Sequence, residues 1–293
     1  MKEPKGIIVA MVTPMNADES VNEKELRNQV NRLVDSGIHG LFCLGTNGEF
    51  YGLSNDEKKE VIQIVADENR GRLPLYAGTG ASTTKETIAL TSYAEAAGVD
   101  AVSVICPYFA VASQQGILNH FTAVASSTKL PLIMYNIPAR AGNQIAVDTV
   151  ATLSKIDNIV GIKDSSGNFD MILQFIEATD DHFSVLSGND SLILWTLMAG
   201  GKGGIAGCAN VFPRELAKIY NHFISGDLAA AKRAQASIRP LRNVFRLGNP
   251  NTIIKRATLL MGYDVGACRA PFNTIDPGID EELYEVLSHF EKQ

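Results

Sequence analysis

Lys163 stands where a nucleophile is expected. It lies near the end of the apolar stretch IVGIKD (159–164), which has the length and composition of a buried strand. Burial disfavours the charged ammonium, and a neutral lysine amine can attack a ketone and form a Schiff base. The alternative is that Lys163 pairs with a buried carboxylate, such as Asp164 or Glu49, and only supports the structure.

The stretch YNIPAR (135–140) carries two residues that suit the same chemistry. The phenol of Tyr135 could carry protons between a Schiff base and its substrate. The planar guanidinium of Arg140 suits a substrate carboxylate. Each residue also has an ordinary structural alternative: a core tyrosine with one satisfied hydroxyl, and an arginine in a surface salt bridge.

Three short segments are rich in glycine: GTNGE (45–49), SGN (187–189) and GGKGG (200–204). Backbone N–H groups of the GTNGE turn could hold a carboxylate. The GGKGG segment precedes the last apolar run, near the place where barrels often bind phosphate, but no Ser or Thr follows its lysine as in a Walker A loop. For all three segments the alternative is tight turning where backbones approach closely.

The elements that position these residues form a repeating pattern. Short apolar runs, each ending in Gly, Pro, Thr, Asn or the IVGIKD motif, alternate with helical patterns; one helix carries its apolar stripe on Leu26, Val30, Leu33 and Val34. Such alternation predicts a parallel sheet, and eight repeats predict a closed (β/α)8 TIM barrel. The expected strands lie in 6–14, 38–46, 73–80, 99–107, 130–138, 159–164, 183–189 and 203–210.

The rest of the chain, after the last barrel helix, contains no strand pattern. We expect the catalytic barrel to span 1–226 and a C-terminal α-helical extension to span 227–293, with helices in 227–245 and 249–263 and a last one near the end. The second choice, an open doubly wound sheet, lacks a GxGxxG after its first strand.

Composition excludes several classes of protein. The 293 residues are 45% hydrophobic with a net charge of −6, which gives no support to a nucleic-acid surface, and no apolar run is long enough for a membrane span. The five histidines have no metal-ligand spacing, so we expect no metal. Four scattered cysteines without CxxC suggest a reducing cytoplasm. The single Trp195, in a helical pattern, is expected in the core.

The motifs GTNGE, YNIPAR, GIKDSSGN, LSGND and GIAGCAN occur in this order at the ends of expected strands, and GNPNTIIK and CRAPF follow. Together they resemble the N-acetylneuraminate lyase / dihydrodipicolinate synthase family over the whole chain. The resemblance implies a class I lyase that needs no cofactor, forms a covalent imine with pyruvate or another 2-oxo acid, and assembles as a homotetramer.

The resemblance also assigns roles. It makes Lys163 the Schiff-base lysine, Tyr135 and Thr46 the proton relay, and the Thr46–Asn47 turn the site of the pyruvate carboxylate. Arg140 would bind the carboxylate of the second substrate. Carbonyls of two further residues, Gly188 and Ile205, would line the pocket.

This sequence departs from the synthase pattern at two positions. Asn47 replaces the second Thr of a GTTGE-type turn, and Phe109 replaces a Tyr that would complete the relay from a neighbouring subunit. Asn55 and Lys58 stand where some synthases have the histidines of a feedback site, so we expect no lysine inhibition.

Four functions stay open at this point. Arg140 favours a 4-hydroxy-tetrahydrodipicolinate synthase that joins pyruvate to aspartate semialdehyde. Phe109 and Asn47 favour an aldolase or dehydratase for a 2-keto-3-deoxy sugar acid. From other classes, a phosphate-binding barrel enzyme would use GGKGG, and a non-catalytic sensor would bind a 2-oxo acid without turnover.

Overall fold

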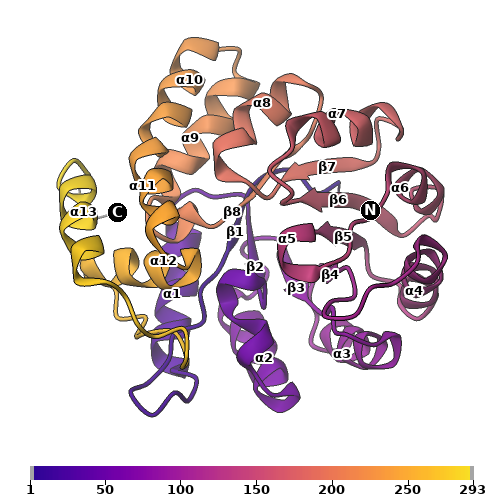
Figure 1. Cartoon of the computed structure of the whole chain (residues 1–293), viewed down its shortest axis with the longest axis horizontal. Helices are drawn as coiled ribbons and strands as arrows, with labels where there is room; N and C mark the ends of the chain where they lie inside the picture. Colours follow the sequence, from indigo (N-terminus) through magenta and orange to yellow (C-terminus); the bar gives the residue numbers. More distant parts are fainter. Residues whose placement is uncertain (1–2, 291–293) are drawn as a thin grey trace.

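The computed structural model describes residues 3–290 and confirms the predicted barrel. Eight parallel strands pair in chain order, and β8 closes the barrel by pairing with β1 (Figure 1). The strands are β1 Gly6–Ala10, β2 Gly40–Cys43, β3 Leu75–Gly78, β4 Ala101–Ile105, β5 Leu132–Asn136, β6 Ile159–Asp164, β7 Ser184–Ser187 and β8 Gly203–Ala206.

Helices surround the barrel and bury one apolar stripe each against it (Figure 1). In the first of them, Asn22 caps the N-terminus by accepting from the Glu25 N–H, and Leu26, Val30 and Leu33 are buried as their spacing predicted. The helices of this layer are α1 Glu23–Asp35, α2 Asn55–Asn69, α3 Thr84–Ala96, α4 Gln114–Ser126, α6 Val147–Leu153, α7 Phe169–Glu177, α8 Ile193–Met198 and α9 Pro213–Ile224. The short helix α5 Pro138–Ala141 lies inside this ring, next to the end of β5 (Figure 1).

The chain after α9 is helical, as expected from the sequence. It forms α10 Leu228–Ser237, α11 Arg239–Val244, α12 Pro250–Leu260 and α13 Pro277–Leu287, along the left side of Figure 1. The single helix expected over 227–245 is wrong: a new helix begins at Arg239 with Pro240 in its first turn, because a proline inside a longer helix would remove a hydrogen bond. The domain division at residue 226 stays a prediction.

Alternate residues of the strands fill the inside of the barrel. The inner cluster contains small and large side chains from seven strands: Ile8, Ala10, Phe42, Tyr76, Ala101, Ile133, Leu186 and Ile205. Because side chains alternate along a strand, Tyr135 lies two residues after an inward position of β5, and Lys163 lies opposite it in register on β6. The polar residues of the site are therefore the upper layer of the inner cluster.

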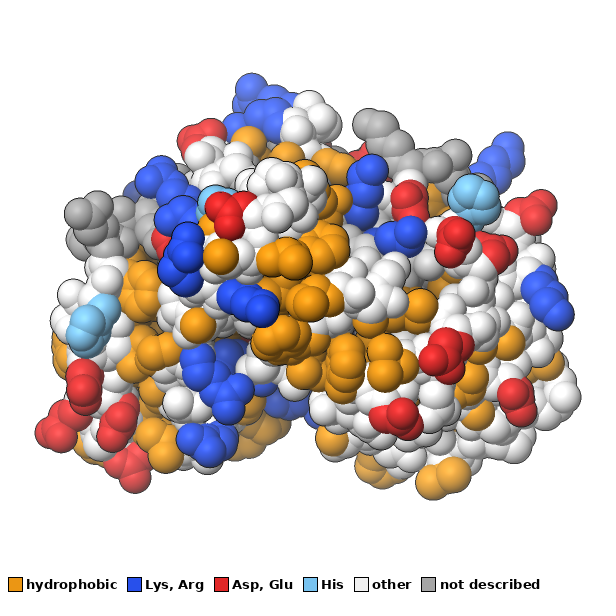
Figure 2. Space-filling view, turned by 90° about the horizontal axis from the view of Figure 1, so that it is seen from above, with side chains coloured by type: hydrophobic (Ala, Val, Ile, Leu, Met, Phe, Trp, Pro, Cys, Tyr) orange, Lys and Arg blue, Asp and Glu red, His pale blue; other side chains and the backbone are white. Residues whose placement is uncertain are grey.

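The expectation that Trp195 belongs to the core is wrong. Its side chain is 40% exposed, and Met198 on the same helix α8 is 49% exposed, because the buried face of α8 is formed by Ile193, Leu194 and Leu197. Figure 2 looks down on the side of the molecule where α8 lies in Figure 1 and shows hydrophobic side chains gathered near its centre. Within 3–290, no helix is long and apolar enough to cross a membrane.

Candidate active site

Lys163 ends inside the barrel, as its place in the sequence predicted. Its side chain is 4% exposed and lines a cavity of about 210 Å³ at the carboxyl ends of the strands. Its Nζ lies 4.0 Å from the centre of the Tyr135 ring and 5.3 Å from that of Phe42. The amine is therefore held between two aromatic rings and open to a cavity.

The structure does not support the alternative that Lys163 is only one half of a buried ion pair. Asp164 points to the other side of the strand, where it accepts hydrogen bonds from Asn136 (2.8 Å) and Ser166 (2.6 Å). Burial raises the pKa of Asp164 above its ordinary value. Glu49 is paired with Lys255 at 2.6 Å. Among the ion pairs of the described residues, none includes Lys163.

Tyr135 and Thr46 form the polar contact next to the amine. The Tyr135 hydroxyl lies 3.1 Å from Thr46 Oγ1, and either group can donate. Both side chains are buried. Hydroxyls at hydrogen-bond distance in a buried site can pass a proton in either direction, so the pair is placed to serve a group bound at Lys163.

The remaining residues singled out from the sequence line the same cavity, which is bordered by Asn47, Arg140, Gly188 and Ile205. At position 188 glycine is required for space: a Cβ there would lie 1.9 Å from Ser165 Oγ and 2.9 Å from Cε of the lysine. The structure thus brings all seven predicted site residues together, while their individual roles stay predictions.

The cavity also contains residues that the sequence reading missed. Arg242 on α11 and Asn251 on α12 line it from the C-terminal helices. The Asn251 side chain donates to the Thr46 carbonyl at 2.8 Å and to the Tyr51 hydroxyl at 3.0 Å. Neither residue follows a strand, and the alternation of strands and helices predicts site residues only at strand ends; the GNPNTIIK motif is the one sequence signal for Asn251.

A buried ion pair holds the GTNGE turn to the C-terminal segment. Glu49 has a backbone φ of 56°, is fully buried, and contacts Lys255 of α12. Lys255 also donates to the Ala267 carbonyl, and the backbone N–H of Arg269 donates to Glu49. Because the ion pair of Glu49 and Lys255 fixes the end of this turn, Thr46 keeps one position relative to the catalytic candidate Lys163.

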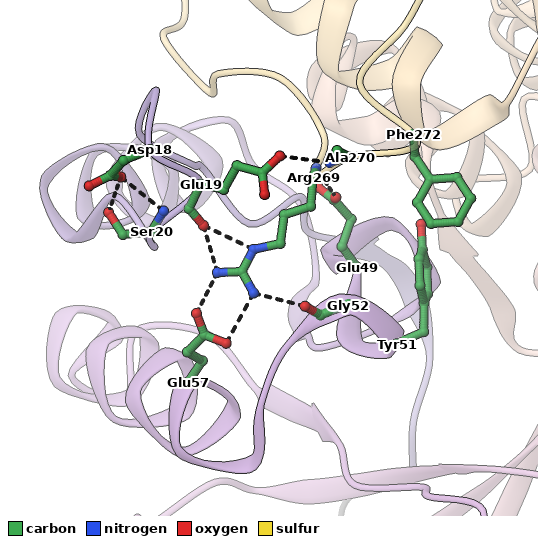
Figure 3. A pocket seen from close by; sticks show the side chains of 10 residues that line it. All are labelled: Asp18, Glu19, Ser20, Glu49, Tyr51, Gly52, Glu57, Arg269, Ala270 and Phe272. Atoms are coloured by element: carbon green, nitrogen blue, oxygen red, sulfur yellow. Dashed lines mark hydrogen bonds and ion pairs between the residues drawn. The ribbon is translucent and has the colours of Figure 1, made fainter.

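Figure 3 shows the pocket beside this ion pair, where Arg269 lies next to Glu49 and Glu57. The Arg269 guanidinium donates to the carbonyls of Glu19 and Gly52 and to the carboxylate of Glu57. The hydrogen bond from Arg269, supported by those from Ser54, lowers the pKa of Glu57 to about 2. The arginine therefore ties the chain after α12 to the loop before α1 and to the start of α2.

Other candidates from the sequence lie away from the cavity. The GGKGG segment leads into β8 and forms its first two residues, so it lies at the amino end of the barrel strands, opposite the cavity. A Cβ on Gly203 would lie 2.1 Å from the carbonyl oxygen of Gly6, which supports the close-packing interpretation. Lys202 pairs with Glu3. Phe109 is 98% exposed, outside the cavity of its own chain.

The four cysteines are free and buried. Burial raises the pKa of Cys43 and of Cys106 to about 12, so neither supplies a thiolate at neutral pH. Across residues 3–290, no group of three or more His, Cys, Asp or Glu side chains has the arrangement of a metal site.

Comparison with known proteins gives the same family as the motifs. Residues 3–290 match the model of the dihydrodipicolinate synthetase family. The 4-hydroxy-tetrahydrodipicolinate synthase of Desulforudis audaxviator is 41% identical over 282 residues, covering 96% of this chain and 96% of that protein.

Solved structures agree. The crystal structure of a dihydrodipicolinate synthase from Bacillus anthracis has a TM-score of 0.95 and 34% identity, and each chain is 99% covered. A structure described as the first monomeric dihydrodipicolinate synthase variant has a TM-score of 0.93 and 28% identity, with 97% of this chain and 96% of that one covered. This chain therefore belongs to the dihydrodipicolinate synthetase family.

Proposed function

We propose that the chain is a class I, Schiff-base-forming carbon–carbon lyase that joins pyruvate to aspartate semialdehyde, as a 4-hydroxy-tetrahydrodipicolinate synthase does. The observation that carries the proposal is a buried lysine amine, 4.0 Å from the Tyr135 ring, that faces a cavity and has no carboxylate partner among the described residues. A lysine in a pocket of this kind is suited to covalent catalysis on a ketone.

The chemistry follows from the positions of three side chains. Lys163 Nζ attacks the keto carbon of pyruvate, and loss of water leaves an imine. Tyr135 and Thr46, 3.1 Å apart, carry the protons that the oxygen gains and the methyl carbon loses. The resulting enamine carbon bonds to the aldehyde carbon, whose oxygen takes up a proton. The condensed product is still bound to Lys163 as an imine. Attack on the imine carbon by water, or by the amine of the substrate itself, releases the product and returns the free lysine.

Binding is divided between the two ends of the cavity. We assign the pyruvate carboxylate to the turn of Thr46 and Asn47, with Gly188 and Ile205 as the wall beside it. Arg140 is exposed, has no ion-pair partner within 3–290, and is assigned to the carboxylate of the aldehyde. The reaction needs no cofactor, because the imine itself withdraws electrons from the adjacent carbon.

We also propose that the protein acts in the cytoplasm as a homotetramer. The exposed Trp195 and Met198 on α8 support self-association, since a hydrophobic patch on a globular surface is a common interface. In such an assembly the outward-facing Phe109 would contact a neighbouring subunit.

The second candidate is an aldolase or dehydratase for a 2-keto-3-deoxy sugar acid, and Phe109 favours it because a phenylalanine cannot pass a proton. The two candidates are separated by measuring turnover with aspartate semialdehyde and with 2-keto-3-deoxy acids in the wild type and in Arg140→Ala. A synthase loses most of its turnover of aspartate semialdehyde in the variant. Turnover of the sugar acids alone, unaffected by Arg140, would contradict the assignment.

A further inference from the structure

The charged groups of the cavity are unevenly distributed. In a chain with a net charge of −6, the cavity is lined by three basic side chains and one acid: Arg140, Lys163, Arg242 and Asp190. The acid is already engaged, because Asp190 is buried and accepts hydrogen bonds from the backbone N–H groups of Gly207 and Cys208. Lys163 needs no counter-charge as the neutral amine of the proposed reaction, so the two guanidinium groups, Arg140 and Arg242, are the cations of the cavity, and neither has an ion-pair partner among the described residues.

Arg242 is held in one orientation at this cavity. Its Nη2 donates to Asn189 Oδ1 at 2.9 Å, its Nε donates to Ser191 Oγ at 3.3 Å, and its guanidinium carbon lies 5.0 Å from the centre of the Phe245 ring. All three partners are neutral, and no ion pair of the described residues includes Arg242. A half-buried guanidinium that is oriented but not neutralised is suited to bind an anion.

We propose that Arg242 is a second binding group for the carboxylate of the aldehyde substrate, acting with Arg140 from the opposite side of the cavity mouth. The inference rests on the proposed function and extends it. The substrate class that follows is a short aldehyde with its own carboxylate, rather than the uncharged aldehyde released from a 2-keto-3-deoxy sugar acid. Two arginines for an uncharged polyol would leave both guanidinium groups without a counter-charge in a confined site.

The test compares Arg242→Gln with Arg242→Lys and with Arg246→Gln as a control. Arg246 follows on the same stretch, is exposed, and does not line the cavity. We expect the KM for aspartate semialdehyde to rise about tenfold to a hundredfold in Arg242→Gln, as for loss of a charge-assisted hydrogen bond. The Lys variant recovers part of the loss, and the control does not change.

Pyruvate provides the readout that separates substrate binding from a structural role. If Arg242 only fixed Asn189 and the adjoining Gly188, its loss would also raise the KM for pyruvate and slow the trapping of the pyruvate imine by borohydride. We expect both to stay within twofold of the wild type. A parallel rise in both KM values, or an unchanged KM for aspartate semialdehyde, would overturn the assignment.

A second comparison uses the wild type with succinic semialdehyde and butanal, which share four carbons but differ in the carboxylate. We expect faster pyruvate consumption with succinic semialdehyde, and a smaller preference in Arg242→Gln. Equal rates, or none with either aldehyde, would refute the carboxylate site. Failure of the proposed function has a different sign from failure of the Arg242 assignment: no pyruvate adduct would form on Lys163 in any of these proteins.

Discussion

Replacing Glu49 by Gln tests whether the buried ion pair holds the site together. The change keeps the size of the side chain but removes the negative charge 2.6 Å from the Lys255 ammonium, which is 1% exposed and otherwise donates to the Ala267 carbonyl. Removing one partner of a buried pair costs about 3–5 kcal/mol, because the remaining charge cannot be solvated. We expect a loss of this size in the free energy of unfolding, measured by urea denaturation at neutral pH.

The double variant Glu49→Gln, Lys255→Met distinguishes an ion pair from two independent effects. It removes both charges, so we expect it to cost clearly less than the sum of the two single changes, with a coupling of about 2 kcal/mol or more. Lys218→Gln, which breaks the exposed pair with Glu215, is the control and should cost about 1 kcal/mol or less. Additive single changes, or a cost near that of the control, would refute the reasoning.

The same experiment has a functional arm. Glu49 ends the turn that carries Thr46, and the Thr46 carbonyl is held by Asn251 of the helix that also carries Lys255. Loosening this connection should raise the KM for pyruvate severalfold in Glu49→Gln. An unchanged KM in a clearly destabilised protein would show that the turn keeps its geometry without the ion pair.

Three further changes have defined outcomes. Tyr135→Phe should lower kcat by about a hundredfold or more and slow the trapping of the pyruvate imine without abolishing it, because proton transfer is lost while the Lys163 amine remains; an unchanged kcat would contradict the relay. Phe109→Tyr should raise turnover of aspartate semialdehyde if Phe109 interrupts a relay, and no change in the rate would show that it does not. Glu57→Gln should cost about 1 kcal/mol at pH 7, because the Arg269 contact lowers the pKa of Glu57 to about 2 but solvent reaches the pair and screens it. This contribution is present above the unfolded pKa of about 4.5 and is lost as pH falls toward 2, so the difference between the two proteins in urea should shrink between pH 5 and 3.

The barrel was predictable because its signal is repeated along the chain. Eight apolar runs that alternate with amphipathic helices leave few other architectures, and the predicted runs contain all eight strands. Apart from β6, which ends at Asp164 as expected, the strands end earlier than predicted: the first run was expected to reach residue 14, but β1 ends at Ala10. Met11 and Val12 are equally buried without pairing in the strand, so hydrophobicity alone does not mark where a strand ends.

The site was predictable only where it is made by strand ends. Lys163 and Tyr135 follow apolar runs, and the period of two along a strand directs both into the barrel. Arg242 comes from a helix of the C-terminal extension, and periodicity does not indicate which end of the barrel such a helix covers. Trp195 was misplaced for a related reason: a short apolar helix contains more hydrophobic residues than its buried face can hold.

The most direct test of the central claim is the mass of the protein after incubation with pyruvate and reduction with borohydride. We expect one reduced pyruvate adduct per chain, on the peptide that contains Lys163, and none in Lys163→Ala. An unchanged mass in the wild type, or an adduct that persists in the Ala variant, would contradict the account.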